Sequence, residues 1–159
     1  GQTTLEDKLS ETRNAIKNGA DEIDYVVNLT KLKAGDTAYI ESEMARITDI
    51  CREFSVVSKV IFENCYLTED EKKTLCHIAA KVKPDFIKTS TGFGTGGATL
   101  EDVALMKKET EGSGVKIKAA GGIRTLKTAL EMIDLGVSRI GSTSSVAIME
   151  EYMAHSPLL

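Results

Sequence analysis

The sequence predicts an α/β fold, and within that class it favours a (β/α)8 barrel over an open doubly wound sheet. Short apolar segments rich in β-branched residues alternate along the chain with segments whose apolar residues recur every three or four positions. This alternation is typical of parallel strands joined by helical crossovers. Lysines in the middle of the predicted strands favour the barrel, because its mouth accommodates charges that an open sheet would bury against helices.

Length and composition indicate one globular domain, which we expect to cover residues 1–159. The chain is 42% hydrophobic and 28% charged, and its net charge of −4 gives no reason to expect nucleic acid or an anionic membrane as a partner. Its apolar runs all stay well below the ~18 residues of a transmembrane helix. Three cysteines at irregular spacing, without a neighbouring histidine pair, argue against a disulfide framework or a metal site and favour the cytoplasm.

Helix caps and apolar periodicity define the individual elements. Leu5, Leu9 and Ile16 share one helical face, and we expect a capping box of Thr3 and Glu6 to open that helix. A second capping box, Thr68 and Glu71, opens a later helix that ends before a proline. Strands are predicted over 22–29, 56–62, 85–89, 115–120 and 138–141, with helices near 100–109, 126–135 and 145–153, besides the one that carries Ile40, Met44 and Ile47.

Four charged residues of consecutive strands are the candidate catalytic centre. Alternation of side chains between the two faces of a strand directs Asp24, Lys59, Lys88 and Lys118 toward one axis. A lysine amine is almost wholly protonated at neutral pH, but a neighbouring ammonium and partial desolvation can bring its pKa to about 7–8. We therefore expect Lys88 to be a nucleophile, with Lys118 keeping it neutral and Asp24 orienting Lys118. In the alternative reading, these lysines lie at strand ends and simply reach solvent.

Glycine-rich turns after the predicted strands are candidates for binding an anion. Glycine lets backbone N–H groups approach a phosphate, and the turns after the last two strands of a barrel commonly bind one. Tight strand-to-helix turns with helix caps would use the same residue types, and this alternative stays open. The candidate substrate-binding residues in these turns are Thr91, Gly92, Gly121, Gly122, Gly141, Thr143 and Ser144.

Four segments of the chain resemble the deoxyribose-phosphate aldolase family. They are Gly19–Asp24 (GADEID), Phe86–Gly92 (FIKTSTG), Lys118–Thr125 (KAAGGIRT) and Arg139–Gly141 (RIG), in that order over nearly the whole chain. The resemblance implies a (β/α)8 barrel in the cytoplasm that serves deoxyribonucleotide catabolism. It implies reversible cleavage of 2-deoxy-D-ribose 5-phosphate to D-glyceraldehyde 3-phosphate and acetaldehyde, without metal or organic cofactor.

The resemblance also implies individual roles. Lys88 matches the Schiff-base lysine, Lys118 the perturbing lysine and Asp24 the proton-relay aspartate, while Lys59 matches a lysine that lines the site. Phosphate contacts carry onto Gly121, Gly122, Gly141, Thr143 and Ser144. Phe93 stands where some members have a lysine, so one phosphate contact of the family is absent at this position.

The strand count departs from the family pattern. Five strands are predicted where a closed barrel has eight, and Lys88 lies on the third of them, whereas the family carries its Schiff-base lysine on the sixth. The chain would thus correspond to strands four through eight, with two open edges and a possible homo-oligomeric assembly. The alternatives are another Schiff-base aldolase or transaldolase acting on a sugar phosphate, and a truncated phosphate-binding fragment without catalysis.

Overall fold

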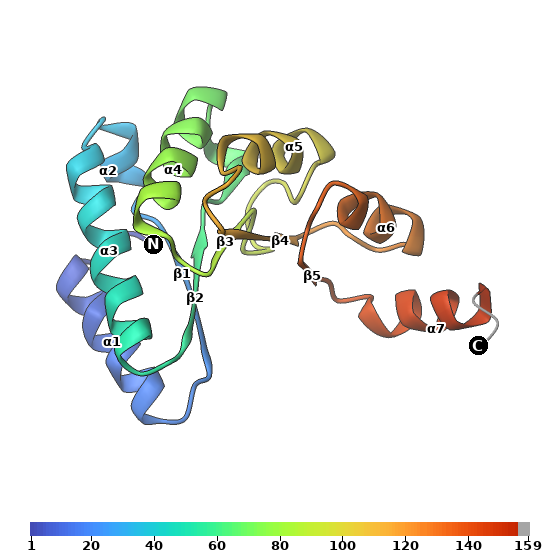
Figure 1. The fold of residues 1–159 in the computed structure, drawn as a ribbon, viewed down its shortest axis with the longest axis horizontal. Coiled ribbons are helices and arrows are strands. Elements are labelled where there is room, and N and C mark those ends of the chain that lie inside the picture. Colours follow the sequence, from blue (N-terminus) through green and yellow to red (C-terminus); the bar gives the residue numbers. More distant parts are fainter. Residues whose placement is uncertain (156–159) are drawn as a thin grey trace.

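The computed structural model describes residues 1–155 as a curved, five-stranded parallel sheet with helices arranged in an arc around it (Figure 1). Residues 156–159, the end of the single domain predicted from the sequence, lie outside the described residues. The strand order follows the chain, β1 (Glu22–Val26), β2 (Val57–Ile61), β3 (Phe86–Lys88), β4 (Lys116–Ala120) and β5 (Arg139–Gly141). The helices are α1 (Leu5–Lys17), α2 (Leu29–Lys33), α3 (Thr37–Glu53), α4 (Glu69–Val82), α5 (Leu100–Glu109), α6 (Leu126–Asp134) and α7 (Ser145–His155), with a 3-10 turn at Asn64–Tyr66.

The register of the strands sets the relative heights of the charged residues. Asp24 pairs with Lys59, and Lys88 pairs with Lys118. Ile61, two residues beyond Lys59, is the partner of Lys88 in the ladder between β2 and β3. Asp24 and Lys59 therefore lie one level below Lys88 and Lys118 on the same face of the sheet.

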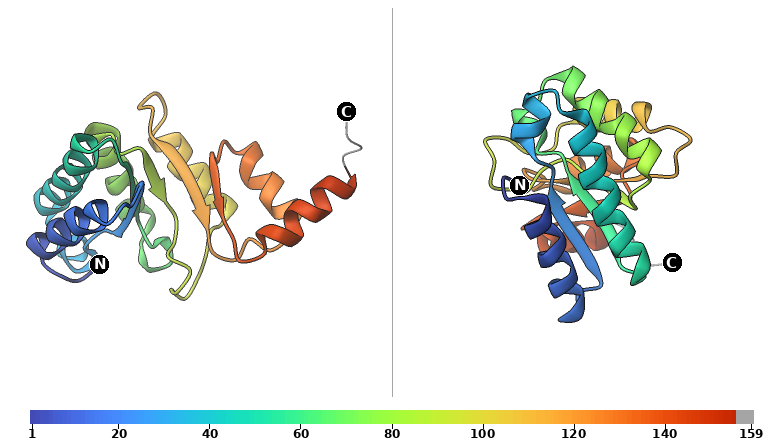
Figure 2. Two further views of the ribbon diagram at one scale, coloured as in Figure 1. Left: turned by 90° about the horizontal axis from the view of Figure 1, so that it is seen from below. Right: turned by 90° about the vertical axis from the view of Figure 1, so that its left-hand side faces the viewer.

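The core lies between the sheet and its helices and is densest under α3 and α4. Ile40, Met44 and Ile47 of α3 and Leu75 of α4 are 0–1% exposed, and burial of each such side chain contributes about 1.5–3 kcal/mol. Figure 2 shows α7 leading away from the sheet at the other end of the molecule. The outer edges of β1 and β5 have no partner strand among residues 1–155.

Two sequence predictions about the first βα unit are wrong. The first helix is capped by Thr4, whose side chain accepts from the amide of Asp7, rather than by a box of Thr3 and Glu6. The first strand ends at Val26 instead of reaching Leu29, because the Asn28 side chain caps α2 by accepting from the Lys31 amide. The helix α2 was not predicted, since its five residues are too few to display helical periodicity.

The other elements confirm the alternation predicted from the sequence. The capping box of Thr68 and Glu71 is present in both directions at the start of α4. Every strand after the first agrees with its predicted range to within one residue at each end, as does α6, and α5 agrees at both ends. None of the helices over residues 1–155 combines the length and the apolar character that a membrane crossing requires.

Candidate active site

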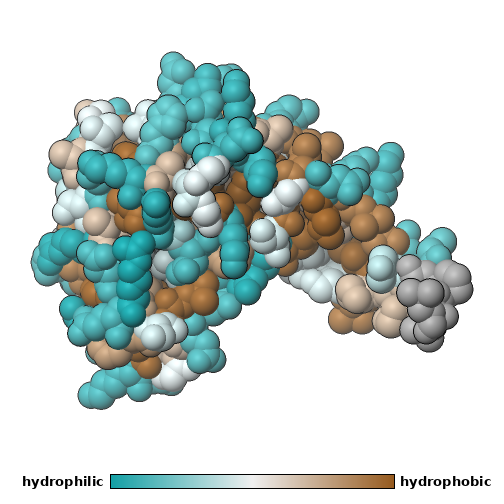
Figure 3. Space-filling model, in the orientation of Figure 1, coloured by the Kyte–Doolittle hydropathy of each residue, from teal (hydrophilic) through white to brown (hydrophobic). Residues whose placement is uncertain are grey.

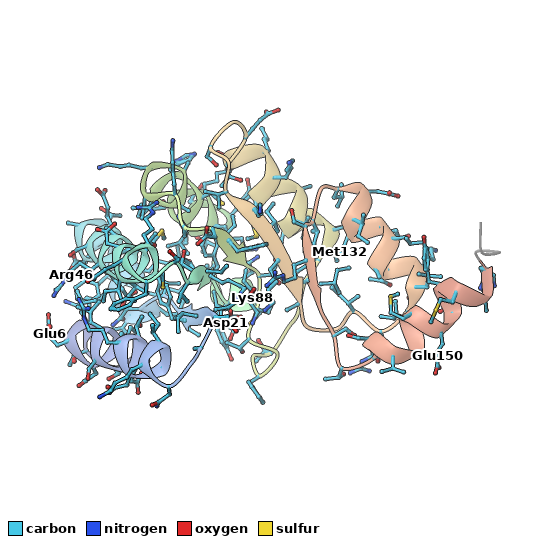
Figure 4. All side chains as sticks on the ribbon, turned by 60° about the horizontal axis from the view of Figure 1, so that its bottom comes forward. Glu6, Asp21, Arg46, Lys88, Met132 and Glu150 are labelled. Atoms are coloured by element: carbon cyan, nitrogen blue, oxygen red, sulfur yellow. The ribbon has the colours of Figure 1, made fainter. Side chains whose placement is uncertain are left out.

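Asp24 is the centre of a charged cluster on the inner face of the sheet. Its Oδ1 accepts a hydrogen bond from Lys59 Nζ at 2.8 Å. Its Oδ2 accepts from Lys88 Nζ at 3.0 Å and from Lys118 Nζ at 2.9 Å. Four consecutive strands thus bring together the four residues that alternation predicted, and Lys88 lies near the middle of the sheet in Figure 4.

The electrostatics of the cluster keep Asp24 ionised. Partial burial by itself would raise the pKa of the carboxyl, but the hydrogen bonds from Lys59, Lys118 and Lys88 outweigh burial and hold that pKa well below its usual range. Asp24 is therefore a hydrogen-bond acceptor for the three lysine side chains at neutral pH. It does not act there as a proton donor.

Lys59 lies below this centre and is 1% exposed. Its ammonium is held by two carboxylates, that of Asp24 and that of Glu22, whose Oε2 lies 2.5 Å from Lys59 Nζ. Two counter-charges offset the cost of burying this ammonium. The contact of Lys59 with Asp24 is observed, whereas its predicted contact with substrate stays a prediction.

A polar cavity of about 360 Å³ opens beside Lys88 and Lys118. Its wall contains most of the residues that the sequence singled out for substrate binding, namely Thr91, Gly92, Gly121, Gly122, Gly141 and Thr143. Arg124 and Ser142 also line it and were not selected from the sequence. Arg124 adds a guanidinium, which suits a phosphorylated ligand, and its place two residues after Gly122 was the available signal.

Close backbone approaches explain two of the glycines around this cavity. A Cβ on Gly97 would lie 2.2 Å from the carbonyl oxygen of Gly121, so the loop after β3 can pack on the turn after β4 only without a side chain there. A Cβ on Gly141 would lie 2.9 Å from Cβ of Ala120 and 3.6 Å from Cε of Lys118. Glycine at this position of β5 leaves room for the side chain of Ala120 on the neighbouring strand β4.

Ser144 was predicted to bind phosphate but does not line this cavity. Its amide donates to Oγ of Ser142 at 2.9 Å, and the Ser142 hydroxyl donates to the carbonyl of Ile123. These bonds tie the turn after β5 to the turn after β4. The predicted phosphate role of Ser144 stays a prediction.

Glu63 fixes the wall of the cavity next to Lys88. Its buried carboxylate accepts from the amide of Thr91 at 3.0 Å and from the Thr91 hydroxyl, and the backbone of Glu63 is left-handed with φ 56°. Its observed partner is Thr91, which lies on the cavity wall.

A second and larger hollow lies outside the charged cluster. It has a volume of about 560 Å³ and is lined mainly by apolar side chains of α6, β5 and α7, where apolar side chains gather in Figure 3. It contains none of the catalytic residues predicted from the sequence. Over residues 1–155 no group of three or more His, Cys, Asp or Glu side chains could hold a metal ion.

Comparisons with known proteins agree on one family. The model of the DeoC/LacD family of aldolases matches residues 1–143. The chain is 57% identical over 150 residues to a deoxyribose-phosphate aldolase of Lactobacillus acidophilus, and 50% identical over 152 residues to one of Bacteroides thetaiotaomicron. These matches cover 94% and 96% of the chain but 63% of each relative, so the chain spans about two thirds of the length of these proteins at most.

Solved structures confirm the fold class. The aldolase QR15 superposes with a TM-score of 0.89 at 41% identity, over 97% of this chain and 68% of its own. A tetrameric deoxyribose-phosphate aldolase of Aeropyrum pernix superposes with a TM-score of 0.87 at 28% identity, over 98% of this chain and 65% of its own. The five strands are therefore a part of a (β/α)8 barrel.

Proposed function

The chain belongs to the DeoC/LacD family of aldolases, and from this premise we propose that it carries a Schiff-base centre for the reversible cleavage of 2-deoxy-D-ribose 5-phosphate. The observation that supports this most is one carboxylate, Asp24, shared by Lys88 and Lys118 beside a glycine-lined cavity. A pair of amines with one counter-charge suits nucleophilic attack on a carbonyl better than it suits stability.

The reaction begins at the aldehyde carbon C1 of the open-chain sugar. The neutral Lys88 amine adds to C1, and loss of water gives a protonated imine. Asp24 holds the Lys88 side chain in place, whereas the positive charge of Lys118 favours the neutral amine over a second ammonium. The imine then serves as the electron sink for the next step.

Bond cleavage leaves the amine as an enamine. A water held by Lys118 and Asp24 takes the proton of the C3 hydroxyl, the C2–C3 bond breaks, and its electron pair moves into the imine. D-Glyceraldehyde 3-phosphate leaves, C2 is reprotonated, and water hydrolyses the imine to acetaldehyde and free Lys88. The proton that left the C3 hydroxyl balances the one gained at C2, and the water lost at the start is regained at the end.

The glycine turns after β4 and β5 suit the phosphate of this substrate. Gly121, Gly122 and Gly141 lie on the same cavity wall as Arg124, and this cavity adjoins both amines. Backbone N–H groups and one guanidinium would bind the phosphate at one end of the sugar while C1 lies against Lys88. The rival proposal, a phosphate-binding fragment without catalysis, needs this cavity but not the paired amines.

Reductive trapping separates the two proposals. The chain is incubated with acetaldehyde and sodium borohydride, and the alkylated lysines are mapped by mass spectrometry. The Lys88 side chain is 11% exposed and that of Lys127 is 85% exposed, so exposure alone predicts that Lys127 reacts first. We expect Lys88 to react first instead, and a folded sample modified at Lys127 but not at Lys88 would overturn the Schiff-base proposal.

The substrate is tested separately by turnover. Deoxyribose 5-phosphate, deoxyribose and other sugar phosphates are compared for release of an aldehyde. We expect the phosphorylated deoxy sugar to be preferred and the preference over deoxyribose to fall in Arg124→Met. Preference for a ketose phosphate would instead favour the transaldolase-like alternative.

A further inference from the structure

An ion pair joins the two strands that are farthest apart in the sheet. Arg139 of β5 donates through Nη1 to Oε2 of Glu22 on β1 at 2.5 Å, although β1 and β5 stand at opposite ends of the strand order. No backbone ladder connects these strands among the described residues. The pair therefore crosses the inner face of the curved sheet diagonally, from Arg139, which is in register with Lys118 and Lys88, down to Glu22, which is in register with Val57.

Arg139 is placed for this contact by an aromatic ring. The guanidinium carbon lies 5.0 Å from the ring centroid of Phe86, which belongs to β3 and is 5% exposed. A guanidinium over an aromatic face is held by the quadrupole of the ring, so its donors keep a fixed direction. Arg139 thus reaches Glu22 from a defined position.

Glu22 continues the contact toward the catalytic centre. The same Oε2 lies 2.5 Å from Lys59 Nζ, and Lys59 in turn donates to Oδ1 of Asp24. The other Asp24 oxygen, Oδ2, is left for Lys88 and Lys118. An unbroken series of ion pairs therefore runs from Arg139 through Glu22 and Lys59 to the carboxylate that both amines share.

We propose that Glu22 and Arg139 are positioning residues of the aldolase centre, which act through Lys59 on the orientation of Asp24 and on the charge around Lys88. The proposal rests on the Schiff-base function proposed above. Lys59 with two carboxylates keeps Oδ1 of Asp24 occupied, so that Oδ2 faces the amines. Without Glu22, the buried Lys59 would have Asp24 as its one carboxylate partner and would draw it away from Lys88.

Substitutions of Glu22 and of Arg139 change the charge near the amines in opposite directions, so the proposal predicts opposite shifts of the Lys88 titration. Removal of the Glu22 charge leaves more positive charge near the amines and favours their neutral forms, whereas removal of the Arg139 charge has the opposite effect. The charged groups that face Lys88 from the neighbouring elements are Glu22 and Asp24 of β1, Lys59 of β2 and Glu63 after it, Lys116 and Lys118 of β4 and Arg124 after it, and Arg139 of β5. Both variants keep all of these except the residue changed.

The experiment is a titration of the lysine side chains by NMR in protein with 13C-labelled lysine. Lys59, Lys88 and Lys118 are assigned through single Lys→Arg variants, and Glu22→Gln is compared with Arg139→Met. We expect the Lys88 titration midpoint to move by about 0.5 pH unit to lower pH in Glu22→Gln and to higher pH in Arg139→Met. The pH profile of borohydride trapping at Lys88 should move in the same two directions.

Glu6 and Arg46 provide the matched control. They form the same kind of pair, Arg Nη1 to Glu Oε1 at 2.9 Å, on the outer helices α1 and α3, and Figure 4 shows them far from Lys88. Glu6→Gln and Arg46→Met should leave the Lys88 midpoint unchanged, both in the NMR titration and in the pH profile of borohydride trapping.

If Glu22 and Arg139 only stabilised the fold, their substitutions would have different effects. Glu22→Gln and Arg139→Met would then lower the melting temperature without moving the Lys88 titration, or would move it in the same direction, and either result would overturn the proposal. The NMR titration needs no imine. A parent chain that forms no Lys88 adduct would thus refute the Schiff-base function while leaving the test of this pair intact.

Discussion

The two ends of the sheet are packed very differently. At the end formed by β1 to β3, the helix α3 buries Ile40, Met44 and Ile47 at no more than 1% exposure. At the other end, Ile133 of α6 and Met149 of α7 are 50% and 52% exposed, and they face the apolar hollow of about 560 Å³. Apolar surface on that side is visible in Figure 3.

The two parts of the proposed site, the charged cluster and the glycine turns that line the cavity, come from these two differently packed ends. Asp24, Lys59 and Lys88 come from the well-packed end, where rigid neighbours hold a charged cluster in one geometry. The glycine turns that line the cavity come from β4 and β5, whose outer helices leave apolar surface uncovered. We therefore expect changes at the first end to affect stability far more than matched changes at the second.

The largest effect is expected at the buried ion pair between Lys8 and Glu43. The two side chains are 6% and 1% exposed, and Lys8 Nζ lies 2.6 Å from Glu43 Oε1. Lys8→Met would leave a buried carboxylate without its cation and should lower the free energy of unfolding by about 3–5 kcal/mol, measured by urea denaturation.

A solvent-exposed pair provides the control for that change. Lys81 and Glu41 are also 2.6 Å apart, but their side chains are 69% and 39% exposed, so Lys81→Met should cost less than about 1 kcal/mol. Equal losses in Lys8→Met and Lys81→Met would mean that burial does not set the cost of losing the cation.

A smaller effect is expected from the same substitution made at both ends. Ile47 is 0% exposed and Ile133 is 50% exposed. Ile47→Ala should cost about 2–4 kcal/mol because it leaves a cavity in a packed core, whereas Ile133→Ala should cost less than about 1 kcal/mol. A loss in Ile133→Ala as large as that in Ile47→Ala would show that α6 is packed as tightly as α3.

The smallest effect concerns Asp24, which connects the two ends through its contacts with Lys59 and Lys118. Its hydrogen bonds hold the folded-state pKa below the unfolded value of about 4. The ionised carboxylate therefore stabilises the folded chain above that unfolded value, and this contribution is lost as the pH falls toward the folded-state pKa.

Asp24→Asn tests this linkage. The stability difference between the parent and the variant should be constant near neutral pH and should shrink by roughly 1 kcal/mol as the pH is lowered from about 5 to 3. Urea denaturation at a series of pH values measures it. A difference that stays constant across this range would mean that the lysine contacts do not favour the ionised form.

The charged cluster around Asp24 was predictable from the sequence because strand alternation has a strict period of two. Lys88 and Lys118 needed only this rule and the positions of their strands to be placed on one face, and a one-residue error in a strand boundary did not change that face. The paired glycines 121 and 122 were predictable because their backbones adopt positive φ, at 88° and 77°, at the end of a strand.

Several side-chain contacts around the cluster and the cavity could not be predicted from the sequence. The contact of Glu63 with Thr91 depends on a left-handed backbone at Glu63 that its sequence does not signal. The contact of Glu22 with Arg139 depends on the curvature of the whole sheet, since 117 positions separate the two residues along the chain. Short helices such as α2 escape prediction because one turn carries too little periodicity.

The amino-acid sequence alone was enough to predict the alternation of strands and helices, the face of each strand that carries charge, and the residue types of the cluster around Asp24. These follow from local rules, in which the period of a strand or the φ of a glycine depends on near neighbours alone. Two contacts became visible only in the folded chain: Asp24 divides its two oxygens between Lys59 and the pair Lys88 and Lys118, and Arg139 reaches across to Glu22. Such contacts depend on sheet curvature and strand register, which are set by the packing of the entire chain.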